Sequence, residues 1–228
     1  MNYILHIDTS SRQAHVSLAA DGKIVEAAVN DLPQDHASFL HPAIEKIIRN
    51  AGITLNNLSA VAVVSGPGSY TGLRVGMATA KGICYALNKP LITLNALDVM
   101  AAAAIAENKF TETTTLFFPM IDARRMEVFT AGYNQQHECI SSYSAMVLTE
   151  NSFAELLTQT TVVFFGSGAG KWQKVCSHPN AMFTSSTIPA SIYSRLSMKA
   201  YTNKQFANLA YAAPFYLKEV HITAENNI

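Results

Sequence analysis

The sequence has 228 residues, of which 49% are hydrophobic and 14% are charged, and its formal net charge is zero. This hydrophobic content excludes an intrinsically disordered chain, and the neutral balance disfavours a free-standing nucleic-acid-binding protein, which usually carries a basic face. The charged fraction is below the roughly 25% of an average soluble domain, which indicates that a partner covers part of the surface; a compact, weakly charged monomer is the alternative.

The first half of the chain predicts a β-meander followed by alternating helices and strands. Asp21-Gly22 is a typical hairpin turn between two short apolar runs. Apolar residues recur with helical spacing from Leu40 to Ala51. In chain order we expect strands at 2–8, 13–20 and 23–29, a helix at 36–51, a strand from 58 into a glycine loop, a helix at 70–87, a strand at 90–95 and a helix at 96–108.

The second half repeats this pattern. An Ile-Asp pair closes a strand at 7–8 and again at 121–122, and a strand enters a glycine loop at 66 and again at 166. The repeat indicates two diverged copies of one unit, joined by a polar linker at 108–113. The expected elements are strands at 115–122, 126–133 and 138–143, a helix at 152–159, a strand at 161–165, a helix after the second glycine loop, and mostly helix at 191–210.

No targeting segment or metal-binding cysteine pair is expected. The N-terminus reaches Asp8 without a long apolar stretch, so it does not resemble a signal peptide, and no apolar run is long enough for a membrane span. Cys84, Cys139 and Cys176 are isolated, with no C-x-x-C pair. We therefore expect a cytoplasmic protein with no membrane partner.

Five glycines lie within residues 64–82, which raises the question of a phosphate-binding loop. A Walker A loop is excluded because no Gly-Lys-Ser/Thr occurs, and the dinucleotide fingerprint is excluded because Thr71 stands at its third glycine. Interior glycines cost a helix about 1 kcal/mol each relative to alanine, so a close backbone contact must offset this cost. Packing on the chain's own sheet and docking of a partner helix explain equally well the stripe of small residues formed by Gly68, Gly72, Gly76 and Ala80.

Candidate catalytic and metal-binding groups are few. Asp8 and Asp122 each end a predicted strand, where a carboxylate either holds a metal-bound water beside a nucleotide or caps the next turn, and we favour capping. His36 and His41 are five residues apart, whereas two ligands on one helix face need a spacing of four, so we favour a polar edge over a metal site. A serine nucleophile elbow is absent. The residues therefore indicate no catalytic group and no metal ligand.

Several motifs together resemble one known family. The repeated unit, with an Asp after each first strand and glycine loops after later strands, is similar to the actin/Hsp70/sugar-kinase superfamily. VVSGPGSYTGLRVGMATAKG (63–82) resembles a segment of its Gcp/Kae1-like group. IDARRMEVF (121–129), IDTS (7–10) and PFYLKE (214–219) resemble the bacterial TsaB (YeaZ) branch, except that Lys218 stands where that branch often has Arg. The resemblance spans residues 3–219.

The resemblance implies an α/β fold of two RNase H-like subdomains, each a mixed five-stranded sheet with flanking helices. The N-terminal domain would comprise residues 1–110, carry the partner interface and be completed by the C-terminal segment 205–228. The C-terminal domain would comprise residues 111–204. The helices at 36–51 and 70–87 would form the interface.

The resemblance also implies a noncatalytic scaffold. The chain would pair with the transferase TsaD and, with the ATPase TsaE, help convert the adenosine beside the tRNA anticodon to N6-threonylcarbamoyladenosine. ATP and a metal ion would sit in the partner subunits, tRNA would be reached through the complex, and the chain alone would form a homodimer. TsaD carries an H-x-x-x-H metal motif, which His36 and His41 do not reproduce.

Two sets of site residues follow from the resemblance. The expected partner interface is Leu40, His41, Ile44, Tyr70, Gly72, Leu73, Gly76, Met77 and Ala80. Vestigial contacts to a nucleotide or phosphate would come from Asp8, Thr9, Ser10, Gly66, Gly68, Gly166 and Gly168. If the stripe faces the partner, Gly76→Leu should leave the fold intact and abolish heterodimer formation.

Two other functions stay open at this point. An ATP-dependent small-molecule kinase of the same superfamily would use Asp8-Thr9-Ser10 and Gly166-Ser167-Gly168 for phosphates and adenosine, although the chain is short for a sugar site. A peptidase is disfavoured because both the metal pair and a nucleophile motif are missing.

Overall fold

The structure, a computed structural model, describes residues 1–30, 35–107 and 114–218. Its first unit opens with a meander in which Asp21 and Gly22 both have positive φ, as a tight hairpin turn requires. The elements of this unit are β1 (Tyr3–Asp8), β2 (His15–Ala20), β3 (Lys23–Val29), α1 (His36–Asn50), the 3-10 turn η1 (Leu55–Asn57), β4 (Leu58–Gly66), α2 (Tyr70–Leu87), β5 (Leu91–Asn95) and α3 (Ala96–Ala106).

The second unit follows the predicted order with two differences. The strand at 181–184 was not predicted, because its four residues are half-exposed and too few to show a period. The last helix ends at Thr202 rather than near 210. The elements are β6 (Leu116–Asp122), β7 (Glu127–Tyr133), β8 (Cys139–Val147), α4 (Ala154–Gln159), β9 (Val162–Phe165), α5 (Ala169–Gln173), β10 (Ala181–Thr184) and α6 (Ala190–Thr202). The predicted linker at 108–113 lies outside the described residues.

Both units contain the same five-stranded sheet. The first has the strand order β3-β2-β1-β4-β5, and the second has the corresponding order β8-β7-β6-β9-β10. In each, the first three strands of the unit pair antiparallel, and the fourth and fifth join in parallel. The predicted fold class, two mixed five-stranded sheets with flanking helices, is therefore confirmed.

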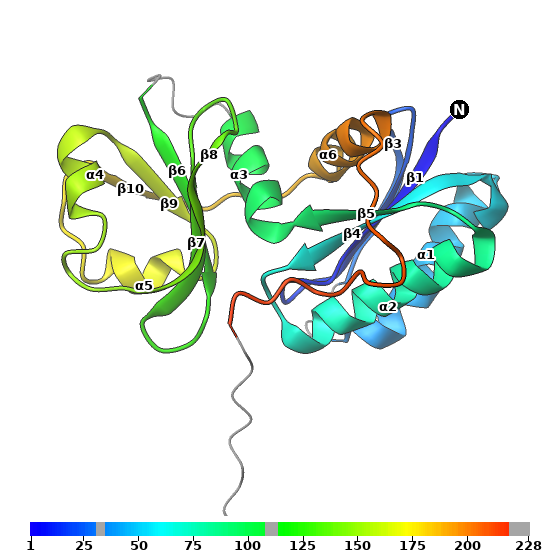
Figure 1. The fold of residues 1–228 in the computed structure, drawn as a ribbon, viewed down its shortest axis with the longest axis horizontal. Coiled ribbons are helices and arrows are strands. Elements are labelled where there is room, and N and C mark those ends of the chain that lie inside the picture. Colours follow the sequence, from blue (N-terminus) through cyan, green and yellow to red (C-terminus); the bar gives the residue numbers. More distant parts are fainter. Residues whose placement is uncertain (31–34, 108–113, 219–228) are drawn as a thin grey trace, which may run out of the picture.

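Helices cover both faces of the first sheet (Figure 1). α1 and α2 pack side by side on one face, over a core that includes Leu5, Leu40 and Met77. α6 packs on the opposite face, where Tyr193 and Ile192 join the core. None of the helices in the described ranges combines the length and apolar character needed to cross a membrane.

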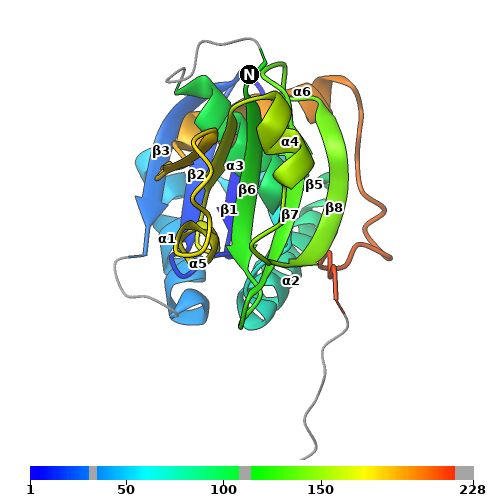
Figure 2. The ribbon, with the colours of Figure 1, turned by 90° about the vertical axis from the view of Figure 1, so that its left-hand side faces the viewer.

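The helix α3 lies between the two sheets (Figure 1) and contacts both; in the view from the side of the second unit it lies behind β6 (Figure 2). Val99 and Ala102 face the first sheet, whereas Leu97 and Ala101 face Phe117 of the second. A helix that is apolar all round is stable only when it is buried on all sides, and its alanines let both sheets approach closely. This explains why the segment 96–106 is rich in alanine.

The C-terminal residues return to the first unit. α6 contacts β1, β3 and β5 of the first unit, whereas the expected second domain of 111–204 includes this helix. Residues 203–218, which we call the C-terminal strap, then run along α2: Ala207 N–H donates to Leu91 O at 2.8 Å, and Phe215 N–H donates to Ser65 O at 2.7 Å. The sequence places α6 after the second glycine loop but carries no local signal for the sheet on which it packs.

Candidate functional site

The first glycine loop and the start of α2 pack against the turn after β1. A Cβ atom on Gly68 or Gly72 would overlap the backbone oxygen of Ser10 or Thr9, respectively. A Cβ on Gly76 would overlap Thr9 Oγ1, which donates a hydrogen bond to Gly72 O at 2.7 Å. The glycines therefore let α2 lie directly on its own chain.

The interpretation of this stripe as a partner-facing surface is wrong. Seven of the nine expected interface residues are buried inside the chain, and only His41 and Tyr70 are exposed. Periodicity identified a face of α2 correctly, but that face belongs to the core because it also carries the large apolar side chains. The buried residues are Leu40, Ile44, Gly72, Leu73, Gly76, Met77 and Ala80.

The carboxylate of Asp8 is fully engaged within the chain. It accepts hydrogen bonds from Ser10 N–H at 2.8 Å and Ser10 Oγ at 2.6 Å, and its other oxygen accepts one from the hydroxyl of Tyr193 at 2.7 Å. Asp8 thus caps the following turn and anchors α6, which confirms the capping interpretation.

Asp122 has the same capping role in the second unit. It accepts hydrogen bonds from Arg124 N–H at 2.6 Å and Lys171 Nζ at 2.5 Å. Burial raises the pKa of Asp122, but the hydrogen bonds from Lys171 and from the Arg124 N–H, together with the charge of Lys171, outweigh this and hold the pKa below its usual value. The matching position of the two aspartates follows from the repeated unit.

The second glycine loop also packs on its own chain. Gly166 has φ +98°, and a Cβ there would lie 2.6 Å from Met120 O. Gly168 N–H donates to the same oxygen at 2.9 Å. These contacts account for both glycines without a ligand, and their use in nucleotide binding stays a prediction, as it does for Gly66, Thr9 and Ser10.

The histidines of α1 do not fit a metal ion. His36 is buried, and its Nε2 lies 3.1 Å from Ser11 O, whereas His41 is exposed on the outer face of the helix. Within the described ranges, no group of three or more His, Cys, Asp or Glu side chains converges as a metal site would require. The expected polar edge is present, since Glu45 and Arg49 form an exposed ion pair at 3.7 Å.

A buried histidine, His6, and a half-buried one, His15, lie close to Asp8. His6 is enclosed between β2 and α6, with its ring nitrogens 3.1 Å from Ser17 Oγ and 2.8 Å from Ser197 Oγ. Desolvation lowers the pKa of His6 to about 3, and it also lowers the pKa of His15, which stacks on Tyr193. Both imidazoles are therefore neutral in the folded chain at neutral pH.

Folding should consequently weaken as the pH falls below 6.5, the ordinary pKa of histidine. The unfolded chain then binds a proton at His6 that the folded chain refuses until about pH 3. Between these limits we expect the free energy of unfolding to fall by about 1.4 kcal/mol per pH unit for His6 alone. Urea unfolding at pH 7.5 and 5 measures this slope. His6→Gln should show a smaller slope; an equal slope would assign the effect to other groups.

A shallow groove lies between α1 and α2 on the outer surface of this helical layer. It consists of two adjoining hollows of about 420 and 510 Å³ that share His41, Leu55 and Ile83. The first is lined by His41, Leu55, Ala78, Thr79, Gly82, Ile83, Ala86 and Leu87, and the second by His41, Ile44, Glu45, Ile48, Arg49, Ile53, Thr54, Leu55 and Ile83. Its lining is mostly apolar although it is open to solvent.

A second stripe of small residues lies along this groove. Ala78, Gly82 and Ala86 follow one another at intervals of four and are exposed. A Cβ added to Gly82 would meet nothing within 4 Å. This stripe lies about 120° around α2 from the buried one. Its spacing of four is visible in the sequence, as is that of the stripe next to the glycine loop.

Comparison with known proteins gives consistent results. The family model described as "TsaD: tRNA N6-adenosine threonylcarbamoyltransferase" matches residues 30–214. The Escherichia coli (strain K12) tRNA threonylcarbamoyladenosine biosynthesis protein TsaB is 31% identical over 172 residues, which are 75% of this chain and 72% of that protein. A Pseudomonas aeruginosa structure described as similar to peptidase YeaZ superimposes with a TM-score of 0.80 at 27% identity, covering 96% of this chain and 100% of the other. Pseudomonas aeruginosa YeaZ gives 0.75 at 26% identity, covering 95% and 100%.

Proposed function

The chain belongs to the TsaB (YeaZ) branch of the TsaD family, and we propose that it serves the biosynthesis of threonylcarbamoyladenosine in tRNA as a noncatalytic scaffold for a TsaD subunit. The role in this modification follows from the named relatives. The scaffold role rests on the α1–α2 groove together with the internal engagement of Asp8.

The groove suits a helix of a protein partner. The axes of packed helices lie about 8–10 Å apart, and small residues at the contact favour the short end of this range. Ala78, Gly82 and Ala86 provide such a row of small residues. Ile83 and Leu55 supply apolar contacts beside it, and Glu45 and Arg49 form a polar rim. We assign this surface to TsaD, and to a second copy of the chain when TsaD is absent. Of the expected interface residues, His41 lines both hollows and Ile44 lines the second, so these two fit this surface.

The internal contacts of Asp8 and Asp122 support a role without catalysis. A carboxylate that assists phosphoryl or acyl transfer must reach substrate, metal or water, but both oxygens of Asp8 accept hydrogen bonds from the chain. In the second unit, Lys171 and the turn backbone hold Asp122. The proposal therefore places ATP and the metal ion in the partner subunits TsaE and TsaD, and lets tRNA reach this chain through the complex.

Reconstitution tests the function directly. Threonylcarbamoyl transfer to tRNA would be measured with purified TsaD and TsaE, with and without this chain. We expect transfer to require the chain, and mixtures to reach full activity when the chain and TsaD are equimolar. Transfer that proceeds at the same rate without the chain would overturn the scaffold proposal, and the isolated chain would then be assayed for ATP turnover.

A further inference from the structure

Exposed aromatic side chains gather on α2 and the C-terminal strap. Tyr85 and Tyr211 are 83% and 85% exposed, so packing within the chain does not account for them. Among the described residues, every exposed aromatic side chain lies on these two segments: Tyr70, Tyr85, Phe206, Tyr211, Phe215 and Tyr216. This segregation indicates a surface with a function of its own.

The strap follows α2 from its C-terminal end to its N-terminal end (Figure 1). Just beyond the C-terminal end of α2, Ala207 N–H donates a hydrogen bond to Leu91 O. In the middle of the helix, Lys81 Nζ donates a hydrogen bond to Ala212 O at 2.8 Å. Near the start of the helix, the rings of Tyr70 and Tyr216 lie 5.4 Å apart. The α2–strap surface formed in this way is about 22 Å long between Tyr70 and Tyr85.

The charged side chains that α2 and the strap themselves contain are all basic. α2 and the strap contain Arg74, Lys81, Lys204 and Lys218 but no Asp or Glu, although the whole chain has 16 residues of each sign. The Arg74 guanidinium lies 4.3 Å from the ring centroid of Tyr70, so a cation and an aromatic face are presented together. A neutral chain therefore carries a local basic surface that only the fold assembles.

We propose that the α2–strap surface binds single-stranded RNA, an inference that rests on the proposed function in tRNA modification. Unpaired bases would stack on Tyr85 and Tyr211, because aromatic rings accept any base, and phosphates would contact Arg74 and Lys204. Neither α2 nor the strap contains an Asp or Glu. Glu127 of β7 pairs with Lys218, the last residue of the strap, at 2.8 Å, so Arg74, Lys81 and Lys204 are the cations left for a polyanion. A base-paired helix would bind less well, since its bases cannot reach the tyrosines.

The RNA surface and the partner groove can be occupied together. Around the helix, the centre of the α2 residues that line the groove lies about 140° from the centre of the row of Tyr70, Arg74, Lys81 and Tyr85, and Ala78 is the groove residue nearest to that row. RNA bound along the strap would therefore leave the α1–α2 groove free for TsaD.

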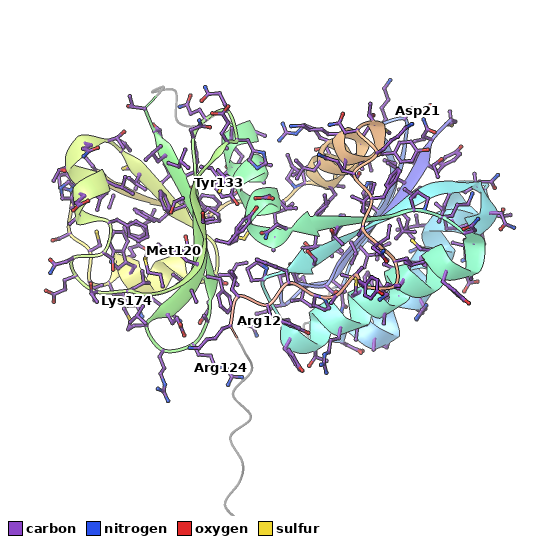
Figure 3. The ribbon with its side chains drawn as sticks, in the orientation of Figure 1. Arg12, Asp21, Met120, Arg124, Tyr133 and Lys174 are labelled. Carbon is purple, nitrogen blue, oxygen red and sulfur yellow. The ribbon has the colours of Figure 1, made fainter. Side chains whose placement is uncertain are left out.

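Binding of a fluorescein-labelled single-stranded RNA of about 12 nucleotides, measured by anisotropy, tests the inference. For the full chain, we expect the double variant Tyr85→Ser/Tyr211→Ser to weaken binding at least about tenfold. Arg74→Glu/Lys204→Glu should weaken it and lower the slope of log Kd against log salt by about 0.7 for each lost phosphate contact. Controls are Lys174→Glu, on the second unit (Figure 3), and Val147→Ser, an exposed apolar residue of β8.

The outcomes separate this inference from the proposed function. Unchanged affinity in both double variants, or equal affinity of the chain for the RNA annealed to its complement, would overturn the RNA surface. So would tyrosine variants that bind RNA normally but lose TsaD, because the surface would then be a protein interface. Complex formation between the wild-type chain and TsaD, read by calorimetry without RNA, reports on the scaffold proposal alone.

Discussion

A Gly76→Leu variant is expected to lose about 3 kcal/mol or more of its free energy of unfolding. The position has no room for a side chain, because even a Cβ would overlap Thr9 Oγ1 and come within 3.5 Å of Ile7 Cγ2. Thr9 Oγ1 cannot move away without breaking its hydrogen bond to Gly72 O, which would leave a buried hydroxyl and carbonyl unpaired. The gain in helix propensity on replacing glycine is about 0.8 kcal/mol and does not compensate.

Urea unfolding of the purified chain, followed by circular dichroism, measures this loss. Gly82→Leu is the matched control, since it makes the same substitution six residues further along α2 where a Cβ meets nothing within 4 Å. It should keep the wild-type free energy of unfolding or gain up to about 0.8 kcal/mol. If the two variants unfolded at the same urea concentration, the packing of α2 on the turn after β1 would be incorrect.

The contrast between these glycines shows what the sequence could and could not predict. Helical spacing and the glycine loop predicted α2 at 70–87, and the helix has those bounds. They also predicted that a close contact offsets the cost of Gly76, which it does. The direction of that contact was not predictable from the stripe alone, because Ala78, Gly82 and Ala86 have the same spacing. Leu73 and Met77, which lie on the Gly76 side, were the signal that this face is the core.

Features that depend on contacts between distant segments were the least predictable. Motifs at 7–10 and 121–129 correctly indicated two copies of one unit with capping aspartates. The same motifs gave no hint that Tyr193 would bind Asp8, because 185 residues separate the two. The basic α2–strap surface likewise forms only when the strap returns to α2, so a neutral composition concealed it.

A Gly82→Leu variant should fold normally and yet bind TsaD at least about 100-fold more weakly. In the free chain the new side chain would project into the α1–α2 groove, where nothing opposes it. In the proposed complex the same volume is filled by the partner helix, which packs against Ala78, Gly82 and Ala86. A leucine in the middle of that row would hold the two helices apart and expose the apolar lining again.

Calorimetric titration of TsaD with the Gly82→Leu variant tests this expectation. Gly170→Leu is the control. Gly170 is also helical, exposed and without neighbours within 4 Å of an added Cβ, but it lies on α5 of the second unit. Gly170→Leu should bind TsaD like the wild type.

Since Gly82→Leu weakens association rather than chemistry, transfer to tRNA should fail at low concentrations of the variant and recover when its concentration is raised. Wild-type affinity for TsaD in Gly82→Leu would move the interface away from this groove. Normal affinity with lost transfer would instead mean that α2 acts on the reaction after the complex has formed.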